Sequence, residues 1–153
     1  MKMTSSEDGH VVRDAALADV DAIMDIESTG ISHPWDRDSI EALINNVNKE
    51  ALVVSTEGGQ TVGYIGASYV LDEAEIGNIC IYPEYRGKGL GRELLLSLES
   101  SLKAQGVHKI FLEVEAQNTG AIALYEHSGY QRYNVRSDYY GKGRDAVLYV
   151  KNV

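Results

Sequence analysis

Apolar residues recur at helical spacing in four stretches of the chain. The most regular stretch is residues 90–105, where five leucines fall on one face of a helix and a glycine follows as a stop signal. Shorter stretches with the same period occupy residues 17–29 and 118–128. A fourth begins near Asp36 or Asp38, a residue type that favours a helix N-terminus. The pattern therefore predicts four helices.

Short apolar runs bounded by turn residues predict the strands. Residues 51–70 indicate two strands joined by the turn "EGGQ", and no linker or internal repeat divides the chain. The predicted element order is β-α-α-β-β-β-α-β-α-β-β, a mixed α/β domain around one sheet. We expect this domain to span residues 11–153, after a flexible segment at residues 1–10. The other strands are expected near residue 11 and within residues 73–82, 108–116, 130–141 and 144–153.

Composition excludes several classes of protein. The net charge of −9 over 153 residues argues against a general nucleic-acid or anionic-membrane binder, which needs a basic face. The single cysteine, Cys80, excludes an intrachain disulfide and a Cys-rich zinc site, and its apolar neighbours predict a small buried side chain. The histidines lack metal-ligand spacing, so we expect no metal. Without an apolar run of about eighteen residues we expect no membrane span and a cytoplasmic protein.

The turn "PEYRGKGLG", residues 83–91, is basic and glycine-rich in an acidic chain. It joins a predicted strand to the leucine-striped helix. A helix N-terminus carries unpaired N–H groups and a partial positive charge, and glycines let an anion approach the backbone. Arg86, Lys88 and Arg92 add full positive charges. Together these features predict a phosphate cradle.

Two familiar nucleotide-binding motifs fit this turn poorly. A P-loop needs Ser or Thr after its lysine, whereas Gly89 follows Lys88. A Rossmann turn needs G-x-G-x-x-G in the first βαβ unit, whereas these glycines alternate and lie past the middle of the chain. A glycine-rich turn that serves only the fold is the remaining alternative.

The sequence "RGKGLG", residues 86–91, resembles the R/Q-x-x-G-x-G/A motif with which GNAT acetyltransferases bind the pyrophosphate of acetyl-coenzyme A. The stretches "NICIYPEYRGKGLGRELL", "LEVEAQNTGAIALYEHSGY" and "DYY" resemble the RimI-type branch, which acetylates the N-terminal α-amine of ribosomal and other proteins. The resemblance implies the GNAT fold, a central, mostly antiparallel sheet of about six to seven strands flanked by about four helices. It implies acetyl-coenzyme A contacts from Ile79, Cys80, Ile81, Arg86, Gly87, Lys88, Gly89, Leu90, Gly91, Arg92, Asn118 and Tyr125.

The same resemblance implies two catalytic residues. Glu113 would be the general base and Tyr125 the general acid that protonates the departing thiolate. From the residues alone, Glu113 could equally be a solvent-facing strand residue, and Tyr125 a core tyrosine. Glu75, near the start of its strand, is a reserve base or a solvated strand end. Asn118 already has a structural role as a predicted helix cap.

On the acceptor side, the resemblance implies that a peptide N-terminus enters between two loops, "GISHPWDR" and "RSDYYGKGRD". Trp35 would shape the pocket for the first residue, although a loop aromatic can also plug the edge of the core. Tyr139 and Tyr140 would hydrogen-bond the peptide backbone. The expected partner is a protein N-terminus, with a ribosomal protein as one candidate and with room for an auxiliary subunit.

Two other functions stay open on this fold. One is acetylation of a small amine such as a polyamine, an amino acid or an antibiotic, because one fold can carry many substrates. The other is non-enzymatic, an acyl-coenzyme A sensor or scaffold. Retention of both candidate catalytic residues argues against the second function.

Overall fold

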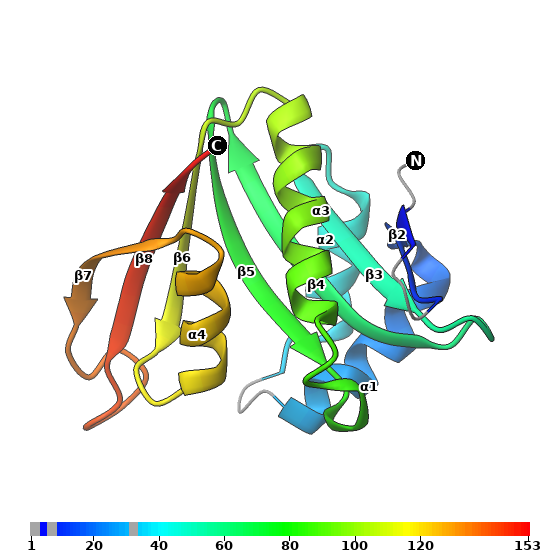
Figure 1. Ribbon diagram of the computed structural model, residues 1–153, viewed down its shortest axis with the longest axis horizontal. Coiled ribbons are helices and arrows are strands. Elements are labelled where there is room, and N and C mark those ends of the chain that lie inside the picture. The colour runs from blue at the N-terminus through cyan, green and yellow to red at the C-terminus, as the bar shows by residue number, and fades with distance from the viewer. Residues whose placement is uncertain (1–3, 6–8, 31–33) are drawn as a thin grey trace.

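A single sheet runs through the part of the chain that the computed structural model describes, residues 4–5, 9–30 and 34–153. Its strands are β1 (Thr4–Ser5), β2 (Val11–Asp14), β3 (Lys49–Ser55), β4 (Thr61–Val70), β5 (Glu73–Ile81), β6 (Lys109–Glu115), β7 (Gln131–Arg136) and β8 (Ala146–Asn152). Across these described residues the sheet has eight strands in the order β1-β2-β3-β4-β5-β6-β8-β7 (Figure 1). Neighbouring strands are antiparallel, except that β5 and β6 are parallel.

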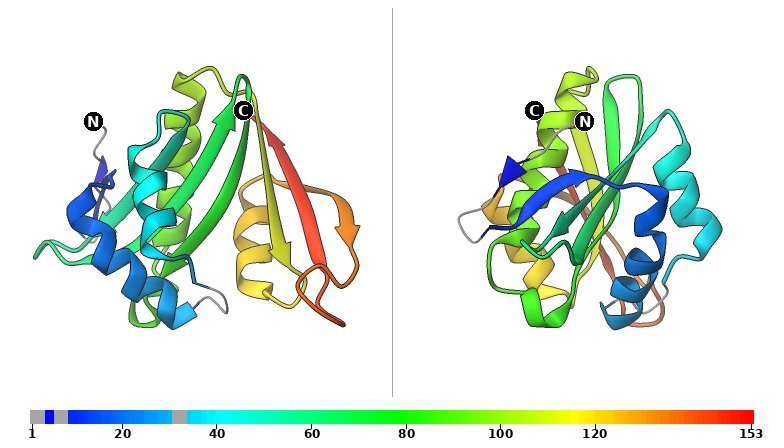
Figure 2. Two further views of the ribbon diagram at one scale, coloured as in Figure 1. Left: turned by 180° about the vertical axis from the view of Figure 1, so that it is seen from behind. Right: turned by 90° about the vertical axis from the view of Figure 1, so that its right-hand side faces the viewer.

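Helices cover both faces of the sheet. The described residues form α1 (Val20–Gly30), α2 (Arg37–Asn45), α3 (Leu90–Ala104) and α4 (Thr119–His127), with short 3₁₀ turns η1 (Leu17–Asp19) and η2 (Pro83–Tyr85). Helices α1 and α2 lie on one face, and α3 and α4 lie on the other (Figures 1 and 2). Helix α3 is the crossover that joins the parallel strands β5 and β6, as such a connection requires.

Side-chain caps begin two of these helices. The Asp36 carboxylate accepts a hydrogen bond from the Ser39 N–H at 2.8 Å, so α2 begins directly after Asp36. The Asn118 side-chain oxygen accepts from the Ala121 N–H at 3.2 Å and begins α4. Each cap satisfies an amide that would otherwise lack a partner.

The leucine stripe of α3 forms the main core between that helix and the sheet. Every leucine of the predicted stripe is at most 2% exposed. Apolar residues of β6 pack into the same core from the sheet side. A smaller core joins α1 and α2 to the other face and includes Cys80, buried as predicted. The main-core members on these elements are Leu90, Leu94, Leu95, Leu98, Leu102, Ile110, Leu112 and Val114.

Strands β5 and β6 separate partway along their length. Their pairing covers only Glu73–Ile76 with Lys109–Leu112, and β5 then continues to Ile81 on the β4 side alone. At this point the β4–β5 register shifts, so that Gly77 has no partner on β4. Because a bulge bends the strand that carries it, β5 turns away from β6 here (Figure 1). The divergence opens the sheet beside the start of α3.

The element order matches the order predicted from the sequence, with one addition. Strand β1 lies within residues 1–10, which were expected to form a flexible segment, and it pairs with β2. It raises the number of strands in the described residues to eight, from the predicted six or seven. A strand of two residues carries no recognisable apolar pattern. Residues 31–33, in a loop expected to meet the acceptor, lie outside the described residues. Within the described residues no helix is both long and apolar enough to cross a membrane.

We predict that Leu98→Ala lowers the free energy of unfolding by about 2–5 kcal/mol, because it leaves a cavity in the main core. Leu98 is fully buried at the centre of the α3 stripe. Urea denaturation followed by circular dichroism measures the change. Leu96→Ala on the same helix is the matched control, because Leu96 is 45% exposed and should change stability by only about 0.5 kcal/mol. Equal losses in both variants would contradict this account of the core.

Candidate active site

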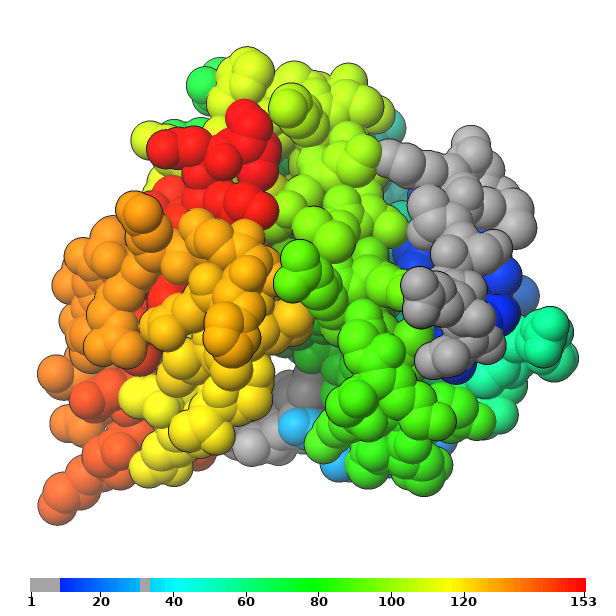
Figure 3. All heavy atoms as spheres, viewed as in Figure 1, coloured from blue at the N-terminus to red at the C-terminus, as the bar shows by residue number. Residues whose placement is uncertain are grey.

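A cavity of about 800 Å³ lies where β5 turns away from β6. Its walls come from the end of β5, the turn before α3, the first residues of α3 and one side of α4. Figure 3 shows the surface hollowed between α4 and the start of α3. Ten of the twelve residues predicted to contact acetyl-coenzyme A line this cavity, and the other two, Lys88 and Tyr125, are placed beside it. The ten are Ile79, Cys80, Ile81, Arg86, Gly87, Gly89, Leu90, Gly91, Arg92 and Asn118.

The glycine-rich turn presents the start of α3 to this cavity. Gly87 and Gly89 have φ angles of +77° and +81°, a backbone conformation that favours glycine. Gly89 is the N-cap of α3 and supplies no side chain to cap the helix. The first amides of this 15-residue helix therefore carry positive partial charge that no side-chain cap offsets. This arrangement fits the anion that the sequence predicted.

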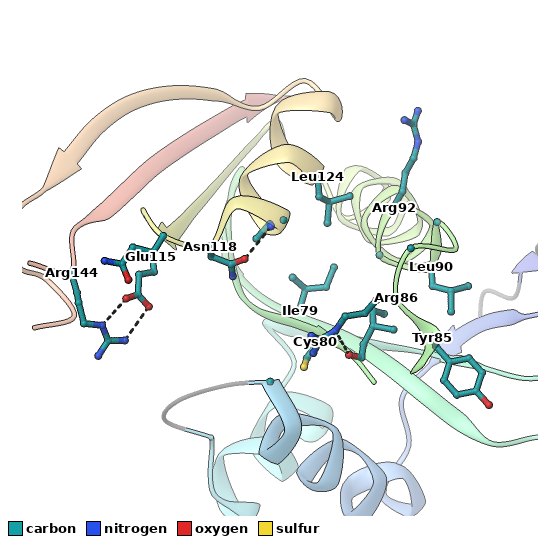
Figure 4. Close-up of a pocket in the computed structure, with 18 residues that line it drawn as sticks. Ile79, Cys80, Tyr85, Arg86, Leu90, Arg92, Glu115, Asn118, Leu124 and Arg144 are labelled. Atoms are coloured by element: carbon teal, nitrogen blue, oxygen red, sulfur yellow. Dashed lines mark hydrogen bonds and ion pairs between the residues drawn. The ribbon is translucent and has the colours of Figure 1, made fainter. Parts of the chain in front are cut away.

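Arg86 braces the wall formed by β5. Its Nε donates a hydrogen bond to the Ile81 carbonyl at 2.9 Å, at the end of the strand (Figure 4). Its guanidinium also lies close to Gly30, where an added Cβ would be 2.6 Å from Nη2. The same added Cβ would lie 3.1 Å from the Cys80 sulfur. Arg86 thus joins the turn, β5 and the end of α1.

The other two cations of the turn differ in their surroundings. Arg92 lines the cavity and its side chain extends away from Ile79 and Cys80 (Figure 4). The Lys88 ammonium instead lies 5.6 Å from the centre of the Tyr85 ring, a cation–π contact. Tyr85 itself lines the cavity, so Lys88 contacts a residue of the cavity wall without lining the cavity.

Burial keeps Cys80 in its neutral thiol form. Burial raises the pKa of the thiol, and the nearby positive charge of Arg86 offsets only part of that effect. A reactive cysteine needs a lowered pKa. Cys80 therefore contributes shape and backbone groups to the cavity wall.

Glu113 and Glu75 lie in a second hollow of about 470 Å³. The β6 residues Ile110, Leu112 and Val114 pack into the α3 core, so Glu113 faces the opposite side of the sheet. Its carboxylate is 3.4 Å from Arg136 Nη1. Two carboxylates thus stand near the strand divergence, on the sheet face away from α3.

Tyr125 is buried behind the wall that α4 gives to the cavity. It is 4% exposed, and its neighbours Ala121 and Leu124 on α4 line the cavity. Its ring meets the Tyr130 ring edge-on, with centroids 5.6 Å apart. Burial, followed by the nearby Tyr140, raises the pKa of the Tyr125 hydroxyl, so this group keeps its proton at neutral pH.

Tyr139 and Tyr140 lie in the turn between β7 and β8, and their rings meet edge-on at 5.1 Å. Tyr139 is exposed, with the Arg136 guanidinium 5.5 Å from its ring centre. Burial raises the pKa of Tyr140, and the charge of Glu113 raises it further. Tyr140 therefore lies near enough to Glu113 and Tyr125 for one to raise its pKa and for Tyr140 to raise that of the other.

The structure adds an ion pair that the sequence analysis missed. Arg144 donates to both oxygens of Glu115, from Nε at 2.6 Å and from Nη2 at 3.0 Å, and both residues line the main cavity (Figure 4). The pair lowers the pKa of Glu115. It ties the turn that carries Tyr140 to the end of β6. Alternation along the strand puts Glu115 on the same face as Glu113, so the sequence could have predicted Glu115 as a site residue. The sequence gives no such signal for Arg144.

Among the residues that the structure describes, no group of three or more His, Cys, Asp or Glu side chains is arranged to hold a metal ion. The residues around the two hollows supply carboxylates, phenols, cationic side chains and backbone amides.

Comparison with known proteins agrees with this geometry. Residues 20–130 match the acetyltransferase (GNAT) family. A Bacillus subtilis (strain 168) protein, provisionally named a ribosomal protein bS18-alanine N-acetyltransferase, is 37% identical over 139 residues, 90% of this chain and 91% of the relative. The Escherichia coli (strain K12) ribosomal protein bS18-alanine N-acetyltransferase is 37% identical over 123 residues, 80% of this chain and 81% of its own.

The folds also agree. The crystal structure of the ribosomal-protein-S18-alanine N-acetyltransferase from Escherichia coli superposes with a TM-score of 0.85 at 29% identity and covers 94% of both chains. The resemblance drawn from residues 86–91 is thereby confirmed, as is the predicted fold class. The chain belongs to the acetyltransferase (GNAT) family and is a homologue of its RimI-type N-α-acetyltransferases, which take their acetyl group from acetyl-coenzyme A.

Proposed function

We propose that this chain transfers the acetyl group of acetyl-coenzyme A to the N-terminal α-amine of a protein. The alanine N-terminus of ribosomal protein bS18 is the first candidate substrate, because relatives at 37% identity are named for that activity. The observation that carries the proposal is the single cavity that extends from the uncapped start of α3 to the unpaired edge of β5. One end suits phosphates, and the other suits the extended chain of the pantetheine arm that carries the acetyl group.

The edge of β5 supplies the backbone groups for that chain. Beyond Ile76, β5 pairs with β4 but not with β6, so the edge that faces β6 has no strand partner there. Free N–H and C=O groups on such an edge can bind an extended ligand as an added strand. An N–H among Ile79–Ile81 directed at the thioester carbonyl would stabilise the oxyanion that forms during transfer.

Glu113 takes the proton of the attacking amine, directly or through a water molecule. An α-ammonium group has a pKa near ~8, so one positioned carboxylate suffices near neutral pH. The nitrogen forms the new bond to the carbonyl carbon, and the bond from that carbon to sulfur breaks. Glu75 shares the hollow with Glu113 and is the reserve base.

Tyr125 gives its proton to the departing sulfur. Its raised pKa keeps the hydroxyl protonated at neutral pH, so the proton is present when the carbon–sulfur bond breaks and the sulfur takes it up. Tyr140, in the β7–β8 turn, holds the acceptor amine near Glu113. Trp35 and Tyr139 complete the acceptor side of the proposed site.

The first experiment identifies the acceptor. The purified chain is incubated with acetyl-coenzyme A, peptides that differ in their first residue, N-blocked lysine peptides and spermidine, and the acetyl group is located by mass spectrometry. We expect acetyl on the α-amine of the peptides, with an alanine start among the best. If acetyl appeared only on spermidine or on lysine side chains, the assignment of the family would stand and the proposed α-amine acceptor would be wrong. Tight binding of acetyl-coenzyme A without any turnover would favour the sensor alternative.

We predict that Glu113→Gln and Tyr125→Phe each lower kcat by about 10²–10⁴-fold, since each removes one proton-transfer group. The dissociation constant for acetyl-coenzyme A should stay within about twofold, because Tyr125→Phe keeps the aromatic ring and Glu113 lies outside the main cavity. Steady-state kinetics and isothermal titration calorimetry separate the two effects. Glu75→Gln is the matched control; if it alone abolished turnover, Glu75 would be the base in place of Glu113.

A pair of charge deletions tests the cradle. Arg92→Ala should weaken acetyl-coenzyme A binding about fivefold at low salt, the effect of one exposed charge near phosphates, and less at high salt. Lys88→Ala removes the same charge from the same turn, but from a side chain that contacts the Tyr85 ring and does not line the cavity. It should cause the smaller loss. Titration of both variants at two salt concentrations measures the difference, and the reverse order would place the phosphates on the Lys88 side.

A further inference from the structure

Glu27 is a carboxylate in an unusual position. It lies on α1, has no exposed surface and accepts hydrogen bonds from three neutral groups. These are the Trp35 backbone N–H at 2.6 Å, the Asn78 side-chain amide at 3.2 Å and the Tyr64 hydroxyl. Burial raises the pKa of Glu27. Because burying a carboxylate costs several kcal/mol, such a residue calls for an explanation beyond packing.

The three donors come from three separate parts of the fold. Trp35 precedes α2, Tyr64 lies on β4, and Asn78 lies on β5 directly after Gly77, the residue that the register shift leaves without a β4 partner. The pairing of β5 with β6 ends at Ile76. Glu27 therefore connects the loop before α2 to β5 at the point where the sheet opens.

The Trp35 side chain is held at the same point by a second contact. A Cβ added to Gly77 would lie 3.1 Å from Cη2 and 3.3 Å from Cζ2 of the indole. The ring thus packs directly on the β5 backbone, where an added Cβ would require the ring to shift by a few tenths of an ångström. One hydrogen bond fixes the backbone of Trp35, and one close approach fixes its ring.

We propose that Glu27 is a positioning residue that sets the first-residue preference of the enzyme. It does so by holding Trp35 against Gly77, so that the indole forms a rigid wall for the first side chain of the incoming protein. This proposal rests on the proposed function, because Trp35 matters for preference only if a protein N-terminus is the acceptor. A carboxylate suits this role because its two oxygens can accept from the Trp35 amide and from β5 together.

The test uses the full chain with Glu27→Gln. Glutamine keeps the size of the side chain but has only one acceptor oxygen, so at least one of the three hydrogen bonds is lost. We expect the KM for an alanine-initiated peptide to rise about tenfold. The preference for alanine over methionine at the first position should shrink, and the dissociation constant for acetyl-coenzyme A should stay within about twofold.

Glu99→Gln is the matched control. Glu99 is also buried, on α3, where it accepts from the Tyr130 hydroxyl at 2.8 Å and from Lys151 Nζ at 2.9 Å. This variant should lower the melting temperature and leave the alanine-to-methionine preference unchanged. The comparison separates loss of stability from loss of preference.

Gly77→Ala disturbs the Trp35 ring through its contact with β5 and leaves the Glu27 side chain unchanged. It should shift the first-residue preference in the same direction, and it supplies the answer if Glu27→Gln does not fold. An unchanged preference in Gly77→Ala and in any folded Glu27→Gln, beside an active wild type, would overturn the positioning role alone. A wild type that acetylates no peptide α-amine would overturn the proposed function, and the positioning role with it.

Discussion

The separation of β5 from β6 is the constraint on which the site depends. The two strands pair over Glu73–Ile76 and Lys109–Leu112 only. If the ladder continued, its hydrogen bonds would occupy the edge of β5 beyond Ile76, where Ile79, Cys80 and Ile81 now line the cavity. The bulge at Gly77 bends β5 at the place where pairing stops, and the start of α3 and one side of α4 then enclose the space.

Two very different forces hold the cavity walls. Apolar packing fixes α3, because its leucines are buried along one face and point the first turn of the helix at the opening. Polar contacts add to packing elsewhere in the wall, since Arg86 holds the end of β5 and the pair of Arg144 with Glu115 holds the β7–β8 turn. The helix is thus set by burial, and directed bonds act at the end of β5 and at the β7–β8 turn.

Features encoded by local pattern could be predicted from the sequence. The leucine stripe, the caps at Asp36 and Asn118 and the glycine-rich turn each depend on residues a few positions apart. Features that depend on distant residues could not. Asn78 donates a hydrogen bond to Glu27, and Arg144 donates one to Glu115. The residues of each pair lie far apart in the sequence, and no pattern of spacing predicts either contact. Strand β1 was too short to carry a pattern.

Within the described residues, the four residue pairs between β5 and β6 are the backbone ladder that joins β1–β5 to β6–β8. Side-chain packing joins the two halves as well, because the main core includes Ile76 of β5 and Leu112 and Val114 of β6 together with the leucines of α3. Packing thus continues where backbone pairing stops, and the sheet opens at the cavity without dividing the core.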